Sequence, residues 1–188
     1  MALELLDPVQ EPVDTIYPLA PRLETLNGKV LGLYNNNKLN SVRLMEMIAQ
    51  DLARDYDFET QPGSYYAFRL MDDNDWGDVA ACDAVILANG DCGACSSSGI
   101  ANAVDLEKRG IPCLLISTPP FFDAVRTMAG VCGMSDIRWA VVDHPIGSME
   151  EGPLRERANI AAQQFREIIL AGSAQAEPVP SVAAAGGR

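Results

Sequence analysis

Two cysteines three residues apart, Cys92 and Cys95, are the residues whose type and spacing most directly suggest chemistry. They enclose Gly93 and Ala94, follow an apolar run and precede a segment with helical periodicity. The unpaired N–H groups at the start of a helix favour the thiolate form of a cysteine, and a thiolate is a nucleophile or a redox group at neutral pH. This spacing also allows a disulfide between the two sulfurs. The pattern therefore predicts a reactive thiol pair.

The same turn has two plainer interpretations. The two cysteines can be small packed residues in a tight turn, with Ser96 as an ordinary helix cap. They can also be ligands of structural zinc, but tetrahedral zinc needs four ligands and the sequence has no second C-x-x-C or C-x-H pair. We therefore expect no metal site. We expect Cys82, Cys113 and Cys132 to be packed small residues.

Polar and flexible residues surround the pair. The negative charge of Asp91 is expected to raise the pKa of the neighbouring Cys92 thiol, unless this carboxylate orients a partner group or serves as a base. Gly93 lets the backbone approach a ligand closely. Ser96 and Ser97 can cap the helix or, with backbone amides, hold a substrate carboxylate or a developing oxyanion.

Short apolar runs alternate with amphipathic stretches in the centre of the chain, which is typical of a parallel sheet flanked by helices. Strands are predicted at residues 29–34, 84–88, 112–117 and 139–142, with a weaker one near Phe58 or at 65–70. Helices are predicted at 41–54, 96–109 and 119–131, with a short one from Asp72 and a long one from a capping box at Ser148 through Leu170. The order predicts an α/β fold, a three-layer flavodoxin-like sandwich with a mainly parallel sheet of about five strands.

Ligands of open parallel sheets bind beyond the carboxyl ends of the strands, so the loops at that edge hold the site candidates. Beside the thiol turn, these candidates are Asn35, Asn37, Lys38 and Asn40 after the first strand, Thr118 after the fourth and His144 after the fifth. The asparagine loop with Lys38 is either a solvated turn or a site for an anionic group. His144, the only histidine, is either a general acid or base or a solvated residue at a strand exit.

The two ends of the chain differ from its centre. Residues 1–26 contain four prolines and no sustained period, so we expect an irregular N-terminal arm that either drapes over a neighbouring subunit or is disordered. Residues 172–188 are mostly Ala, Gly, Pro and Ser and are expected to form a disordered tail. Residues 27–171 then form a single α/β domain.

Composition narrows the function classes. The chain has 188 residues with 14 basic and 26 acidic side chains, a net charge of −12, which argues against nucleic acid and anionic membrane as partners. No apolar run reaches the roughly 20 residues of a membrane span, and no export signal is visible. Five cysteines do not fit a secreted disulfide framework, so we expect a cytoplasmic protein with reduced thiols.

Common cofactor motifs are absent from the sequence. It has no G-x-x-x-x-G-K-[ST] phosphate loop, no G-x-G-x-x-G after the first strand, no H-E-x-x-H and no G-x-S-x-G. A flavodoxin-like layout does not by itself imply a flavin. We therefore expect no cofactor.

The thiol turn resembles the motif of the UGSC family, which is named for selenocysteine (or cysteine), glycine, serine and cysteine. The similar segments are GDCGACSSS at 90–98, AVDLEKRGIP at 103–112 and an Asn-x-x-Lys-x-Asn loop at 35–40. The resemblance covers roughly residues 28–170. It implies that Cys92 stands at the selenocysteine or cysteine position and Cys95 at the second cysteine, while Ala94 replaces the motif's serine.

Two wider likenesses imply different reactions. The motif is similar to the selenocysteine segment of the B subunits of glycine and related reductases, which cleave carbon–heteroatom bonds reductively. A more distant likeness is to the aspartate and glutamate racemase superfamily, which includes maleate isomerases and arylmalonate decarboxylases. Both imply a reactive thiol.

Three functions are therefore open. The first is a thiol-dependent enzyme, such as a cysteine-dependent oxidoreductase, that acts on a small anionic molecule, with Cys92 as the attacking thiolate and Cys95 as the resolving or second catalytic thiol. The second is non-redox racemase, isomerase or lyase chemistry by the same thiolate. The third is an accessory subunit that carries sulfur or a metal such as copper on its thiols. A homodimer or a partner subunit is compatible with each.

Overall fold

The structure is a computed structural model that describes residues 16–170, apart from the side chain of Asn89. The strands are β1 (Val30–Asn35), β2 (Glu59–Ser64), β3 (Ala84–Gly90), β4 (Cys113–Ser117) and β5 (Ala140–Val141). The α-helices are α1 (Ser41–Leu52), α2 (Asp73–Trp76), α3 (Gly93–Lys108), α4 (Phe122–Val131) and α5 (Glu151–Ile169). Two 3₁₀ turns, η1 (Gly77–Ala81) and η2 (Pro119–Phe121), lie before β3 and α4.

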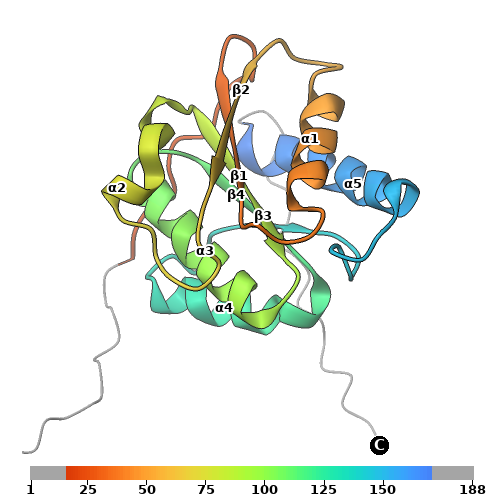
Figure 1. The fold of residues 1–188 in the computed structure, drawn as a ribbon. Coiled ribbons are helices and arrows are strands. Elements are labelled where there is room, and N and C mark those ends of the chain that lie inside the picture. The colour runs from red at the N-terminus through yellow and green to blue at the C-terminus, as the bar shows by residue number, and fades with distance from the viewer. Residues whose placement is uncertain (1–15, 171–188) are drawn as a thin grey trace, which may run out of the picture.

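The five strands form one parallel sheet in the order β2-β1-β3-β4-β5. Figure 1 shows α1 and α5 side by side on one face of the sheet, with α3 and α4 on the other. This arrangement confirms the predicted α/β class and the three-layer flavodoxin-like sandwich. Because every strand is parallel, all strand-to-helix loops of the sheet leave at the same edge.

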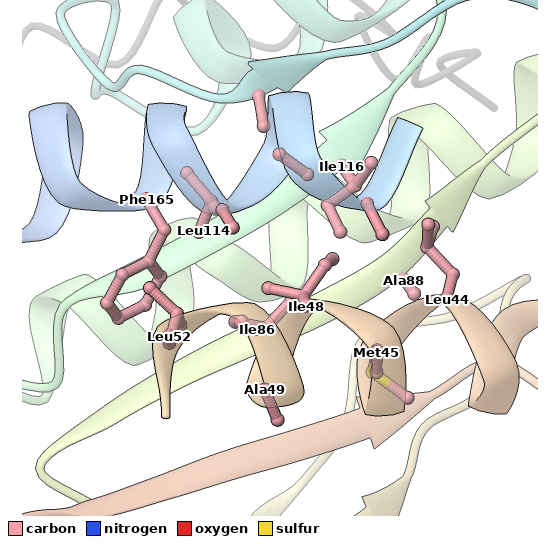
Figure 2. Packing of buried hydrophobic residues seen from close by; sticks show 14 of the residues in the cluster. Leu44, Met45, Ile48, Ala49, Leu52, Ile86, Ala88, Leu114, Ile116 and Phe165 are labelled. Carbon is pink, nitrogen blue, oxygen red and sulfur yellow. The ribbon is translucent and has the colours of Figure 1, made fainter. Parts of the chain in front are cut away.

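One half of the core lies between the sheet and the α1–α5 layer. Leu44, Ile48 and Leu52 of α1 recur every four residues and are fully buried, as the helical period requires. They meet Phe165 of α5 and the sheet residue Ile86 (Figure 2). Each of these side chains stabilises the fold by about 1.5–3 kcal/mol through burial.

The other half of the core lies between the sheet and α2, α3 and α4. Tyr34 packs edge-on against Trp76 at 5.7 Å between ring centroids, and its ring also covers Gly63 of β2. A Cβ atom at Gly63 would lie 2.5 Å from the Tyr34 ring, so the aromatic packing requires glycine there. Burial, together with the charges of Cys82 and Asp78, raises the pKa of Tyr34 to about 12.

The weaker strand predicted near Phe58 is β2 at Glu59–Ser64, whereas the alternative position, residues 65–70, forms a loop. β2 is an edge strand of polar and small residues with Pro62 in its centre, so its pairing depends on main-chain bonds to β1 and not on an apolar pattern.

The predicted capping box at Ser148 does not form. Helix α5 begins at Glu151, and its N-cap Glu150 makes no side-chain capping bond. Instead, the Asn40 amide binds the carbonyls of Ile146, Gly147 and Met149 and keeps this segment in a loop. A capping box does form at Asp72, where the short helix α2 was predicted to begin.

Residues 16–26 pack against the chain's own α/β sandwich. The Tyr17 N–H donates to the Gly133 carbonyl at 2.9 Å, and Leu23 forms a parallel bridge with Leu170. The Ala20 N–H donates to the buried Glu107 carboxylate at 2.7 Å. The remainder of the expected arm, residues 1–15, and the expected tail at 172–188 lie outside the described residues.

Within residues 16–170, no helix combines the length and the apolar character that crossing a membrane requires.

Candidate functional site

The strand order changes direction between β1 and β3, and a cavity lies at this point. The chain goes from β1 to β2 on one side and from β3 to β4 on the other, so the loops after β1 and β3 diverge. Such a switch point at the carboxyl edge is where open parallel sheets bind ligands. The cavity has a volume of about 260 Å³ and is lined by Lys38, Leu39, Asp91, Cys92, Cys95 and Gly147.

The predicted thiol pair forms one wall of this cavity. The sulfurs of Cys92 and Cys95 lie at disulfide-bonding distance, and the structure joins them as a disulfide with a Cα–Cα distance of 5.3 Å. This distance falls within the roughly 4.4–6.8 Å that disulfides span. Cys92 is partly exposed, whereas Cys95 is 1% exposed. Cys92 is therefore the sulfur that an incoming molecule reaches first.

Helix α3 begins at Gly93, three residues before the predicted start, so Cys92 is its N-cap. The Cys92 sulfur accepts a bond from the Cys95 N–H at 3.2 Å, a role that the sequence assigned to Ser96. In the reduced protein, this N–H group and the dipole of the helix both favour a thiolate at Cys92. The same residue thus caps the helix and lines the cavity.

The serines after the thiols do not line the cavity. The Ser96 hydroxyl lies 3.2 Å from the Ser117 hydroxyl, and both side chains are buried. A Cβ atom at Gly90 would meet each of these two oxygens at 2.7 Å, so glycine is required where β3 approaches α3 and β4. Ser97 is half-buried and does not line the cavity, and a Cβ at Gly93 would meet nothing within 4 Å.

Asp91 connects the thiol turn to the loop after β5. Its two carboxylate oxygens accept the N–H groups of Ile146 and Gly147, each at 2.9 Å. The same carboxylate lies 3.0 Å from Nδ1 of His144, which also lies 3.2 Å from the Thr118 hydroxyl. His144 and Thr118 do not line the cavity, so they contact it through Asp91.

These contacts fix the tautomer of neutral His144. The Thr118 hydroxyl donates its hydrogen to the Gly90 carbonyl at 3.2 Å, so it can only accept from the histidine. The Asp91 carboxylate is also an acceptor. Nδ1 therefore carries the proton, and Nε2 is the free acceptor of the ring.

The asparagine loop after β1 positions residues around the cavity. The Asn35 amide donates to the Gly63 carbonyl at 2.9 Å and its oxygen accepts the Asn37 N–H at 2.9 Å. Asn37 and Asn40 have φ angles of 58° and 61°, which asparagine tolerates well. The Asn40 amide donates to three carbonyls of the 146–149 segment and so joins the asparagine loop to this segment.

Lys38 is the charged residue of this loop that lines the cavity. Within residues 16–170 it forms no ion pair with a carboxylate, and its ammonium lies 4.8 Å from the centre of the Phe68 ring. Asp91 also lines the cavity, but two backbone N–H groups and His144 already bind its carboxylate. The cavity therefore offers a cation that forms no ion pair among residues 16–170 and that lies in the same lining as the thiols.

The other cysteines are poor nucleophiles. Burial, reinforced by Asp83 and Asp78, raises the pKa of Cys82 to about 11, and burial also raises the pKa of Cys113 and of Cys132. Cys82 follows η1 and is buried, as expected for a packed small residue. Across residues 16–170, no cluster of three or more His, Cys, Asp or Glu side chains is placed to hold a metal ion.

Sequence reasoning missed two cavity residues, Leu39 and Gly147. Leu39 stands inside the asparagine loop, and its apolar side chain gave no chemical signal. Gly147 lies three residues beyond His144, the candidate after the fifth strand. A Cβ atom there would lie 3.3 Å from the Asp91 carboxylate, which is closer than an ordinary van der Waals contact, so a larger residue would require this carboxylate to shift.

A sequence model of the UGSC family matches residues 4–171. A search among curated proteins finds no match to this chain.

Proposed function

Because this chain belongs to the UGSC family, we propose that the thiol pair of the family motif makes it an enzyme, a cysteine-dependent oxidoreductase that reduces a small anionic molecule. Cys92 is the attacking thiolate and Cys95 is the resolving thiol. One observation carries the proposal: the two sulfurs lie at disulfide-bonding distance in the wall of a cavity at the switch point of the sheet. A merely structural turn needs neither the cavity nor the pairing.

The proposed reaction balances in two steps. The Cys92 thiolate attacks an electrophilic atom of the substrate and displaces a leaving group, which departs with its bonding electrons. Cys95, as a thiolate, then attacks the Cys92 sulfur, closes the disulfide and releases the substrate fragment, which takes up a proton. The substrate gains two electrons and the cysteine pair loses two. A low-molecular-weight thiol or a dithiol protein then reduces the pair again.

The surroundings support this division of roles. The partly exposed Cys92 meets the substrate, and Cys95 lies buried behind it, where it reaches the Cys92 sulfur but not a bulky reagent. Lys38 attracts the anion because no carboxylate neutralises its charge among the described residues. Asp91 holds the opposite wall and connects His144 to the site.

The test uses the disulfide of thionitrobenzoate, an anionic probe whose thiolate product absorbs visible light. The reduced wild-type protein is expected to release two equivalents per chain in a fast phase, because Cys95 resolves the mixed disulfide on Cys92. Cys95→Ser should release one equivalent and keep the adduct on Cys92. Cys92→Ser should lose the fast phase and react at least about tenfold more slowly. Cys132→Ser, which changes a half-buried thiol elsewhere, is the matched control and should behave as wild type.

Each result separates the candidate functions. One equivalent from the wild type, with a stable adduct, would show that Cys95 does not resolve and would favour non-redox chemistry by Cys92. An unchanged fast phase in Cys92→Ser would refute the proposal. Copurified copper or persulfide on the pair, with no reduction of any substrate, would favour an accessory subunit.

A further inference from the structure

The loop between β2 and α2 is fastened to α3 through its main chain. The Ser98 hydroxyl donates to the Ala67 carbonyl, and the Asn102 amide donates to the Arg69 carbonyl at 3.1 Å. The Asn102 oxygen also accepts the Met71 N–H at 2.8 Å, and this asparagine is fully buried. The backbone of residues 67–71 is therefore held against the helix that begins at Cys92.

The same loop displays apolar side chains to solvent. Tyr66, Phe68 and Leu70 are 54%, 72% and 57% exposed, whereas their neighbours Tyr65 and Ala67 are buried. A loop whose backbone is fixed by buried polar bonds cannot easily turn these side chains inward. Exposed apolar side chains grouped in this way mark a contact surface.

Lys38 connects this surface to the cavity. Its ammonium lies 4.8 Å from the centre of the Phe68 ring, and Lys38 also lines the cavity, together with Leu39. Leu39 is 77% exposed. A molecule that enters toward Cys92 therefore passes a positive charge that stands between two apolar side chains, Leu39 and Phe68.

We infer that the substrate of the thiol pair is an anion that carries an apolar, preferably aromatic, group, with its charge at Lys38 and its apolar group against Leu39 and Phe68. This inference rests on the proposed function and names its substrate class. Water occupies about 30 Å³ per molecule in the liquid, so the 260 Å³ cavity holds about nine non-hydrogen atoms. The reacting part of the substrate fits inside, and the apolar group lies at the mouth.

Charge favours this occupant. The chain carries a net charge of −12, yet a cation, Lys38, lines this cavity. The Asp91 carboxylate in the same cavity already accepts two backbone N–H groups and lies beside His144. An aromatic ring on the ligand can pack against Phe68 while its carboxylate remains near Lys38. Neither a neutral aromatic molecule nor a small anion makes both contacts.

The test measures binding without any thiol reaction. Ligand-observed NMR gives the dissociation constants of propionate, phenylpropionate and phenylpropanol for the intact wild-type protein. We expect phenylpropionate to bind about tenfold more tightly than each of the other two, because aromatic contact and charge each contribute. Phe68→Ser should reduce its advantage over propionate to about twofold. Val131→Ser removes an apolar side chain that is 61% exposed at the end of α4 and should change nothing.

The outcomes separate the two proposals. Equal affinities for phenylpropionate and propionate, or a Phe68→Ser protein that binds like wild type, would overturn this inference even if Cys92 is reactive. Tighter binding of phenylpropionate to a protein whose Cys92 is inert would refute the proposed reaction and keep the binding site. A concentration-dependent dimer that Phe68→Ser dissociates, seen by sedimentation, would assign the apolar surface to a second copy and overturn the inference.

Discussion

The two cysteines of the turn differ in exposure, and on this difference we base their proposed roles as nucleophile and resolving thiol. Cys92 lies at the cavity and caps α3, whereas Cys95 is buried in the first turn of the helix. A nucleophile must reach its substrate, and a resolving thiol must reach only the nucleophile. The geometry matches both requirements without any movement of the helix.

The pH dependence of thiol labelling should distinguish Cys92 from Cys82. With a pKa of about 11, Cys82 has about 0.1% of its thiol ionised near pH 8, so its labelling should rise about tenfold per pH unit until the pH approaches that pKa. In the reduced protein, Cys92 should be labelled near neutral pH, because the helix N-terminus favours its thiolate. Iodoacetamide labelling with peptide mass spectrometry measures both profiles. Equal labelling of the two residues near neutral pH would contradict the assignment of Cys92.

Sequence spacing predicted that Cys92 and Cys95 form a pair, but it did not predict the role of their neighbours. The serines were expected to cap the helix, because serine is a common cap and cysteine is not. The position of the α3 cap depends on where β3 ends. Pairing of β3 with β4 extends to Gly90, two residues past the predicted end of the strand. Ser96 is thereby placed against Ser117, a contact between residues 21 apart that no local pattern reveals.

The loops after β1, β3 and β5 form one connected unit around the cavity. Asn40 binds the carbonyls of Ile146, Gly147 and Met149 at 2.8–3.3 Å, while Asp91 binds the N–H groups of Ile146 and Gly147. The 146–149 segment, which forms the wall opposite the thiols, is therefore bound by both the loop after β1 and the loop after β3. Without these bonds, the Gly147 backbone would not keep its place in the cavity.

Replacing Asn40 by glycine should destabilise this unit. The change keeps the positive φ angle but removes an amide that serves three carbonyls, which should lower the free energy of unfolding by about 1–3 kcal/mol. Asn37→Gly is the matched control: Asn37 also has a positive φ angle and is exposed, and the bond recorded for it uses its backbone N–H, so the change should cost less than about 1 kcal/mol. Denaturant unfolding measures both. Equal losses would show that the Asn40 amide does not hold the loop.

The long buried elements were predictable, and the edge elements were not. β3 and β4 are apolar over most of their length and buried on both faces, so their apolar sequence pattern predicted both strands. β2 is polar and depends on main-chain pairing with β1, and the start of α5 depends on Asn40, which is 111 residues away from Glu151 in the sequence. Local patterns carry no information about such distant partners.

At the scale of the whole molecule, the parallel sheet brings the loops that hold the candidate residues to one edge, but only some of these residues line the cavity. Because all strands run in one direction, the prediction that loops after β1, β3 and β5 meet at one edge was derivable from the sequence. Which side chains face the cavity was not. Lys38, Asp91, Cys92 and Cys95 line it, whereas Asn35, Ser96 and Thr118 bind the protein around it.

The N-terminal segment belongs to the same packed structure over its described part. The buried Glu107 carboxylate at the end of α3 binds the N–H groups of Ala20 and Cys113 and pairs with Arg22. It thus joins residues 16–26, α3 and β4 at the end of α3 opposite the thiols. The match to the UGSC family, which starts at residue 4, includes this segment.

The most direct test of the central claim is a redox titration of the intact protein. The chain is equilibrated in graded mixtures of oxidised and reduced dithiothreitol, quenched by alkylation and analysed by intact and peptide mass spectrometry. As one two-electron couple, Cys92 and Cys95 should be labelled together or not at all, in a single transition along a scale on which each tenfold change in the ratio changes the potential of the mixture by about 30 mV. If singly labelled molecules dominate the transition, or if both cysteines stay labelled at every ratio, the two thiols do not form a redox pair and the account is wrong.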